Sequence, residues 1–181
     1  MEVIVLRKII FMVAAILFAL TATTFAAREN VGVIIIGGAE FKTDDYYKIV
    51  KDELNPRSGA KILVGNDMQS RYQKYWLNRG YVGDQTPRRD DLISFTRMSG
   101  CGKVVCLVVN NSAVDSHNNA GRREKDRISV QVDAYICTPT AVADVFTASC
   151  DSNSKTSNLR ARRGAFRKCL DTICKSLNRQ I

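Results

Sequence analysis

The chain has 181 residues and carries 27 Lys and Arg against 18 Asp and Glu, a net charge of +9, with a single histidine. Apolar residues make up 45% of the chain and charged residues 25%, a globular composition that excludes a largely disordered protein. One histidine also argues against a zinc enzyme, because catalytic zinc sites use several histidines or a recognisable cysteine pattern. We therefore expect no metal and no other cofactor.

The N-terminus has the three parts of a secretory signal peptide. A basic head with Arg7 and Lys8 precedes an uncharged apolar run over residues 9–20, and small residues follow as far as Ala27. We expect cleavage near Ala26 or Ala27. The alternative is an uncleaved membrane anchor, because the uncharged stretch over residues 9–27 is near the lower limit of about 17 residues needed to span a bilayer.

Cleavage would release residues 28–181, about 154 residues, which suits a single domain. Its net charge of about +8 favours anionic surfaces such as phosphate-rich polymers or lipid headgroups. A lipoprotein needs a cysteine at the cut, but the first cysteine is Cys101. No second long apolar run follows, so we expect no transmembrane segment after cleavage. We expect a secreted or periplasmic location, which disfavours nucleic acid as a partner.

The first half of the mature chain alternates strands with helices. Short β-branched runs bounded by glycines predict buried strands at residues 31–36 and 61–64. Three helices are predicted from caps at Thr43, Asp67 and Thr86-Pro87 and from stops at Pro56, Gly80 and Gly100. The apolar side of the third helix comprises Leu92, Ile93, Phe95 and Met98.

The second half begins with the most apolar strand pattern in the chain. Residues 103–109 are apolar on both faces and predict a central strand. Residues 110–126 are polar and predict a long exposed loop. The strictly alternating run at 127–136 predicts a half-buried antiparallel strand, and residues 142–148 predict its hairpin partner.

A polar linker at 151–157 is expected to lead into a closing amphipathic helix over 158–178. Its expected core stripe is Leu159, Phe166, Cys169, Leu170, Ile173 and Leu177. The order β-α-β-α-α-β-β-β-α predicts an α/β (α+β) fold with a single mixed sheet of about five strands, a C-terminal hairpin and a closing helix. The first three strands are joined through helices and should run parallel.

This order resembles the small envelope domains of the TolB amino-terminal, CsgG and LpoB type. The resemblance rests on the runs that take the places of the central strand, the alternating strand, the returning strand and the closing helix, at residues 102–109, 128–136, 141–148 and 159–177. It implies an envelope partner-binding or scaffold domain without catalysis. The segments 73–76 and 159–166 also look like uncharacterised secreted proteins of Gram-negative Firmicutes.

Two groups of residues are candidate binding sites. Ligands of open α/β sheets bind at the carboxyl ends of the parallel strands, which predicts a cleft lined by Gly37, Gly38, Asn66, Asn110 and Asn111. Clustered arginines on the closing helix and near the 110–126 loop predict an anion-binding surface made of Arg160, Arg163, Arg167, Arg122 and Arg123. The alternatives are that the glycines serve turn geometry and that the arginines form a solvated helix face.

The six cysteines allow disulfides in a secreted chain, but several lie within apolar runs. We expect mostly free, buried thiols. The alternative is that one or two disulfide bridges form.

No catalytic constellation is found. Any Ser–His–Asp arrangement must use His117, and the GxSxG motif is absent. The acidic pairs Asp44-Asp45 and Asp90-Asp91 fall in first helical turns, where the helix dipole accounts for them.

We therefore predict a secreted or periplasmic, non-enzymatic domain that binds an envelope protein or an anionic envelope component. The alternative is a small extracytoplasmic hydrolase or ligand-binding protein that uses the cleft at the strand ends. A basic anchor on anionic surfaces is a third hypothesis.

Overall fold

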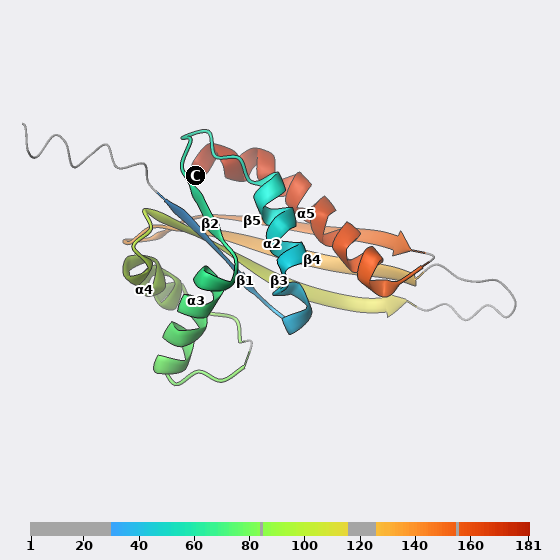
Figure 1. Ribbon diagram of the computed structural model, residues 1–181, viewed down its shortest axis with the longest axis horizontal. Coiled ribbons are helices and arrows are strands. Elements are labelled where there is room, and N and C mark those ends of the chain that lie inside the picture. The colour runs from blue at the N-terminus through green and yellow to red at the C-terminus, as the bar shows by residue number, and fades with distance from the viewer. Residues whose placement is uncertain (1–29, 84, 116–125, 155) are drawn as a thin grey trace, which may run out of the picture.

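The computed structural model describes residues 30–83, 85–115, 126–154 and 156–181, and for residues 111–115 and 126 it describes the backbone alone. These residues form a five-stranded sheet in the order β2-β1-β3-β4-β5. Helices cover both faces of the sheet, α2 and α5 on one side and α3 and α4 on the other (Figure 1). The predicted α/β (α+β) fold with one mixed sheet, a C-terminal hairpin and a closing helix is confirmed.

The first three strands are parallel, as their helical connections predict. β1 (Val31–Ile36) pairs with β2 (Ile62–Val64) on one side and with β3 (Lys103–Asp115) on the other. Every residue of β1 is buried, because helices cover both faces of the sheet at this point. β3 takes the centre of the sheet, as the apolar residues on both faces of its first half predict.

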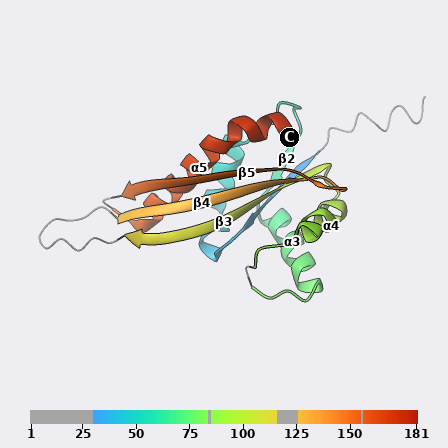
Figure 2. The ribbon, with the colours of Figure 1, turned by 180° about the vertical axis from the view of Figure 1, so that it is seen from behind.

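The last three strands form an antiparallel meander that is longer than the sequence patterns predict. β3 continues to Asp115, β4 spans Asp126–Cys137 and β5 spans Val142–Ser154. The predictions of a loop from residue 110 and of a linker from residue 151 are therefore wrong over 110–115 and 151–154. Most of their side chains are polar, but their backbones continue the hydrogen-bonded ladder, and the far end of the meander carries no described helix on its second face (Figure 2). Residues 116–125 lie outside the described residues.

The helix starts differ from the predicted caps. In α2 (Asp44–Glu53) Thr43 holds the N-cap position, but its side chain makes no capping hydrogen bond. Gly65 directly precedes α3 (Asn66–Asn78), so Asp67 lies in the first turn instead of capping it. α4 (Arg89–Ser99) begins after the predicted Thr86-Pro87 start.

α5 (Asn158–Gln180) is the longest helix and is capped by its own flanking residue. The Ser157 hydroxyl accepts a hydrogen bond from the Arg160 backbone N–H at 3.3 Å. The apolar stripe of α5 is buried from Phe166 to Leu177, but Leu159 is 44% exposed. No described helix is long and apolar enough to cross a membrane.

The sheet separates two apolar clusters. α2 and α5 enclose one cluster, in which the rings of Phe41, Tyr46 and Phe166 pack edge to face or tilted. α3 and α4 enclose the second, which contains Trp76 and Phe95. Met98, expected on the apolar side of α4, is 72% exposed, because α4 turns only its Leu92 and Phe95 side toward the sheet.

Candidate functional site

The residues of the predicted cleft are spread along the strand ends. Gly37 follows β1 and lies against β3, where a Cβ atom would come within 2.7 Å of the Val109 carbonyl oxygen. Its φ of 150° also favours glycine, so close backbone packing explains the residue. Gly38 directly precedes the short 3-10 helix η2 (Ala39–Phe41).

The asparagines of the predicted cleft occupy two different places. Asn110 and Asn111 are strand residues, paired with Gln131 and Val130 of β4, because β3 continues well beyond the end of β1. Asn66 is the first residue of α3 and lines a groove that contains neither Gly37 nor Asn110. The predicted residues therefore do not converge on this groove.

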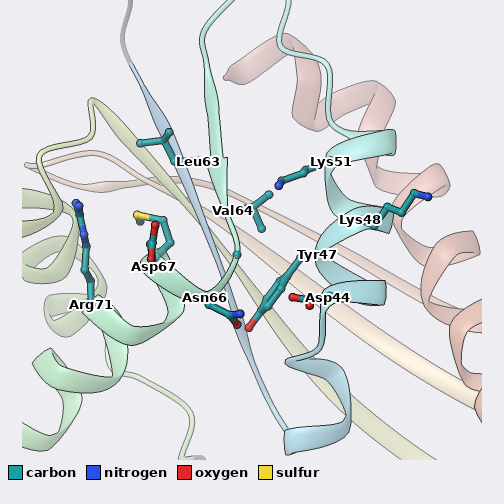
Figure 3. Close-up of a pocket in the computed structure, with 11 residues that line it drawn as sticks. Asp44, Tyr47, Lys48, Lys51, Leu63, Val64, Asn66, Asp67 and Arg71 are labelled. Carbon is teal, nitrogen blue, oxygen red and sulfur yellow. The ribbon is translucent and has the colours of Figure 1, made fainter.

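The groove that Asn66 lines runs along the outer edge of β2 and has a volume of about 530 Å³ (Figure 3). β2 pairs with β1 only, so its other edge has no strand neighbour in the described sheet. α2 borders the groove on one side and α3 on the other. The lining residues are Asp44, Tyr47, Lys48, Lys51, Leu63, Val64, Gly65, Asn66, Asp67, Met68 and Arg71.

Local sequence explains why this edge stays open. Leu63 and Val64 point to opposite faces, toward the α3 and α2 sides respectively (Figure 3), and each packs at the margin of one apolar cluster. Gly65 has a φ of 129°, a backbone conformation that suits glycine and ends the strand after three residues. The chain then enters α3 at once, and no described strand pairs with the outer edge of β2.

Cationic side chains border both sides of the groove. Lys48 and Lys51 come from α2 and Arg71 from α3, against the carboxylates of Asp44 and Asp67. Neither lysine takes part in an ion pair found among the described residues. The helical spacing of Asp44, Lys48 and Lys51 places them on one face of α2.

Tyr47 adds a polar ring to the same wall of the groove, and its hydroxyl lies beside the Asn66 side chain (Figure 3). Burial, and then the nearby Asp44 carboxylate, raise the pKa of Tyr47. The ring therefore stays neutral at physiological pH and can donate a hydrogen bond. The groove offers hydrogen-bonding groups and an excess of positive charge.

A second cavity, of about 350 Å³, lies beyond the carboxyl end of β1. Half of its lining residues carry amide or aromatic side chains, namely Gln69, Gln73, Gln85, Tyr72 and Trp76. The predicted cleft also lay near this strand end, but it contained none of these residues. The available signal was the spacing of Gln69, Gln73 and Trp76, which puts the two amides beside an aromatic ring on one helix face.

The predicted arginine surface of α5 is partly engaged in contacts with α2. Arg163 forms an ion pair with Asp45, and Arg167 lies 3.7 Å from an Asp52 oxygen and 3.3 Å from a Glu53 oxygen. These pairs bridge α5 to α2. Arg160 is exposed at the start of α5, whereas Arg122 and Arg123 lie outside the described residues.

The acidic pair in α4 contains one buried carboxylate. Asp91 is 2% exposed and accepts hydrogen bonds from the Tyr75 hydroxyl at 3.4 Å, the Arg79 guanidinium at 3.2 Å and the Tyr81 hydroxyl at 3.0 Å. It therefore holds α4 against the end of α3.

In the described part of the chain, no group of three or more His, Cys, Asp or Glu side chains is arranged to hold a metal ion.

No family model and no curated protein matches the chain. Among solved structures it is similar to the PelC dodecamer from Paraburkholderia phytofirmans, at 11% identity over 83% of this chain and 88% of that chain, with a TM-score of 0.44. It is also similar to the LpoB C-terminal domain from Salmonella enterica, at 8% identity over 71% of this chain and 84% of that chain, with a TM-score of 0.39. A third similar structure is lipoprotein GNA1162 from Neisseria meningitidis, at 10% identity over 82% of this chain and 97% of that chain, with a TM-score of 0.42.

These similar structures include the LpoB type named in the sequence resemblance. All three TM-scores lie below 0.5, so the proposals for this chain rest on its own residues.

Proposed function

We propose that this chain is an exported, non-enzymatic domain that binds an envelope protein at the open edge of β2. The observation that carries the proposal is the groove between α2 and α3, whose floor is an unpaired strand edge. The backbone N–H and C=O groups of such an edge can bind an extended peptide as an additional strand. Side-chain pockets on either side would then select the peptide sequence.

The charges of the groove favour an acidic segment in the partner. In an extended chain, acidic residues at every second position point to one face, where they can contact Lys48 and Lys51 of α2. Leu63 and Val64 provide apolar contacts at the floor, since both are only half-buried. We therefore expect a partner segment that alternates apolar and acidic residues.

Export of the chain is part of the same proposal. The basic, apolar and small-residue parts of residues 1–27 favour secretion, and residues 28–181 would then act as the exported domain. An anionic envelope polymer is the competing partner, because it would use the same cations without needing the backbone of β2.

A nuclear magnetic resonance titration separates these two partners. A short peptide of alternating valine and glutamate should shift the backbone amide signals of Ile62, Leu63 and Val64, whereas a valine–lysine peptide should not. An inorganic polyphosphate that shifts lysine signals but leaves the β2 amides unchanged would instead support polymer binding. Equal shifts with both peptides would contradict the proposal.

Charge reversal tests the cationic wall. The double substitution Lys48→Glu and Lys51→Glu should weaken binding of the acidic peptide roughly tenfold, because it replaces attraction with repulsion. Lys175→Glu, at an exposed position of α5 away from the groove, is the matched control and should bind as the wild type does. Equal loss in the groove and control variants would indicate a general effect of net charge.

The second cavity supports a second candidate function, binding of a small neutral polar ligand. Its amide and aromatic side chains are suited to hydrogen-bond and stack on a sugar ring. Screening a panel of envelope saccharides against wild type and Gln73→Ala tests this candidate. Saccharide binding that Gln73→Ala leaves unchanged would exclude this cavity as the binding site. The alternative hypothesis of a small hydrolase requires His117, which lies outside the described residues.

A further inference from the structure

Two cysteines face each other between β5 and α5. The Cys150 sulfur on β5 lies 3.9 Å from the Thr172 hydroxyl of α5. The Cys169 thiol on α5 donates to the Val130 carbonyl oxygen at 3.1 Å and lies 3.6 Å from that of Ala148. Val130 is the register partner of Cys150, so both sulfurs occupy the same level of the sheet.

The helix geometry brings the two sulfurs together. Thr172 follows Cys169 by three residues, so both side chains lie on one face of α5. Cys150 contacts this face from the strand below. Burial and a hydrogen bond with the Cys150 thiol raise the pKa of Cys169 to about 12. Cys169 is therefore held as a thiol directly beside its neighbour.

Exposure distinguishes this pair from the other cysteines. All six cysteines are free and five are buried, whereas Cys150 is half-buried. Cys106 and Cys137 are also hydrogen-bonded to each other, but both are fully enclosed in the second apolar cluster. An oxidant in solution can therefore reach a sulfur in the first pair without unfolding the chain.

We propose that Cys150 and Cys169 form a disulfide that joins β5 to α5 when the chain meets a disulfide oxidant. The Cys150 thiolate attacks one sulfur of the oxidant's disulfide and expels a thiolate, which leaves a mixed disulfide on Cys150. Cys169 then gives up its proton and attacks the Cys150 sulfur, and the second thiol leaves. Two electrons and two protons pass to the oxidant, which becomes two thiols.

The bond would attach an edge strand to the closing helix. β5 has a sheet neighbour on one side only, so its outer end depends on α5 for cover. The disulfide would close the segment that contains the β5 end and the first half of α5, and would restrict the unfolded chain. This inference does not depend on the groove at β2, although its use in the cell requires export to an oxidising compartment.

Thiol counting by alkylation and mass spectrometry tests the inference. The folded full chain, treated with oxidised glutathione and then denatured, should lose two of its six alkylatable thiols. Proteolysis should release a peptide pair linked between Cys150 and Cys169. Cys150→Ser should keep all its remaining thiols free, and Cys174→Ser should still lose two. Circular dichroism checks that each variant is folded.

Three results would overturn the inference. All six thiols could stay free in the folded chain, or the linked peptides could join other cysteines. A stable mixed disulfide with glutathione on Cys150 would show that the Cys169 sulfur does not reach it. Cys169→Ala serves as the second variant, because it should retain such a mixed disulfide where the wild type resolves it.

Discussion

The side-chain amide of Gln69 takes the place of a strand beside Ile35. Its Nε2 donates to the Ile35 carbonyl oxygen at 2.8 Å, and its Oε1 accepts from the Ile35 N–H at 3.1 Å. β2 pairs with β1 only as far as Val33, so these backbone groups would otherwise lack a partner on this side. The same contact fixes α3 against the sheet, between the groove and the second cavity.

Removing this amide should destabilise the fold. Gln69→Leu leaves both backbone groups of Ile35 unpaired beneath an apolar side chain, which should lower the free energy of unfolding by about 2–3 kcal/mol. Urea denaturation followed by circular dichroism measures the change. Gln73→Leu, one turn later and exposed, is the matched control and should change stability little. Equal effects from the two substitutions would contradict the role of Gln69.

Asp91 and its neighbour Asp90 provide a second stability prediction with a matched control. Asp91→Asn should lower the free energy of unfolding by about 2–3 kcal/mol, because a buried acceptor of three hydrogen bonds loses its charge. Asp90→Asn should have little effect, since Asp90 is exposed in the same helical turn. Thermal unfolding of both variants checks the difference. A larger effect at Asp90 would mean that charge at the start of α4, and not the buried contacts, controls stability.

Tyr46 should make the fold sensitive to high pH. Its ring is buried between α2 and α5, and burial outweighs the attraction of Arg162 and Arg163, which raises the pKa of Tyr46 to about 12. The unfolded tyrosine ionises near 10, so the folded state holds its proton more tightly. Its contribution to stability is therefore present below pH 10 and is lost as the pH rises from about 10 to 12.

Tyr46→Phe isolates this effect. The Tyr46 hydroxyl has no hydrogen-bond partner among the described residues, so the substitution should leave stability at neutral pH nearly unchanged. Above pH 10 the variant should lose less stability than the wild type, as measured by urea denaturation at a series of pH values. Parallel losses in both proteins would show that other groups, such as the cysteines, control the alkaline transition.

The arginines of α5 should differ in their contribution to anion binding. Arg163 is engaged with Asp45, whereas Arg160 is exposed at the start of the helix. Arg160→Gln should therefore lower the salt concentration that elutes the protein from a heparin column, and Arg163→Gln should change it less. Equal shifts would indicate that the Arg163 ion pair opens when a polyanion binds.

Local patterns in the sequence predicted the order of elements because strand and helix periodicities are properties of neighbouring residues. The apolar run of β1 became a fully buried strand, and the alternating run of β4 became a half-buried strand, both where expected. Residues 110–115 and 151–154 escaped prediction for a physical reason. Most of their side chains are polar, and only the pairing of their backbones with a distant strand makes them part of the sheet.

The candidate sites depended on contacts between distant segments. The sequence placed Arg163 and Arg167 on one helix face, but their carboxylate partners belong to α2, more than a hundred positions earlier. Likewise, Lys48 and Arg71 carry no local signal for a groove. Only the short length of β2 and the positions of α2 and α3 create it.

Periodicity and chain order thus determined the fold class and the candidate export signal by themselves. Tertiary structure decided which charges pair, which strand edge stays open and which cysteines meet, because these depend on packing between segments that the sequence keeps far apart.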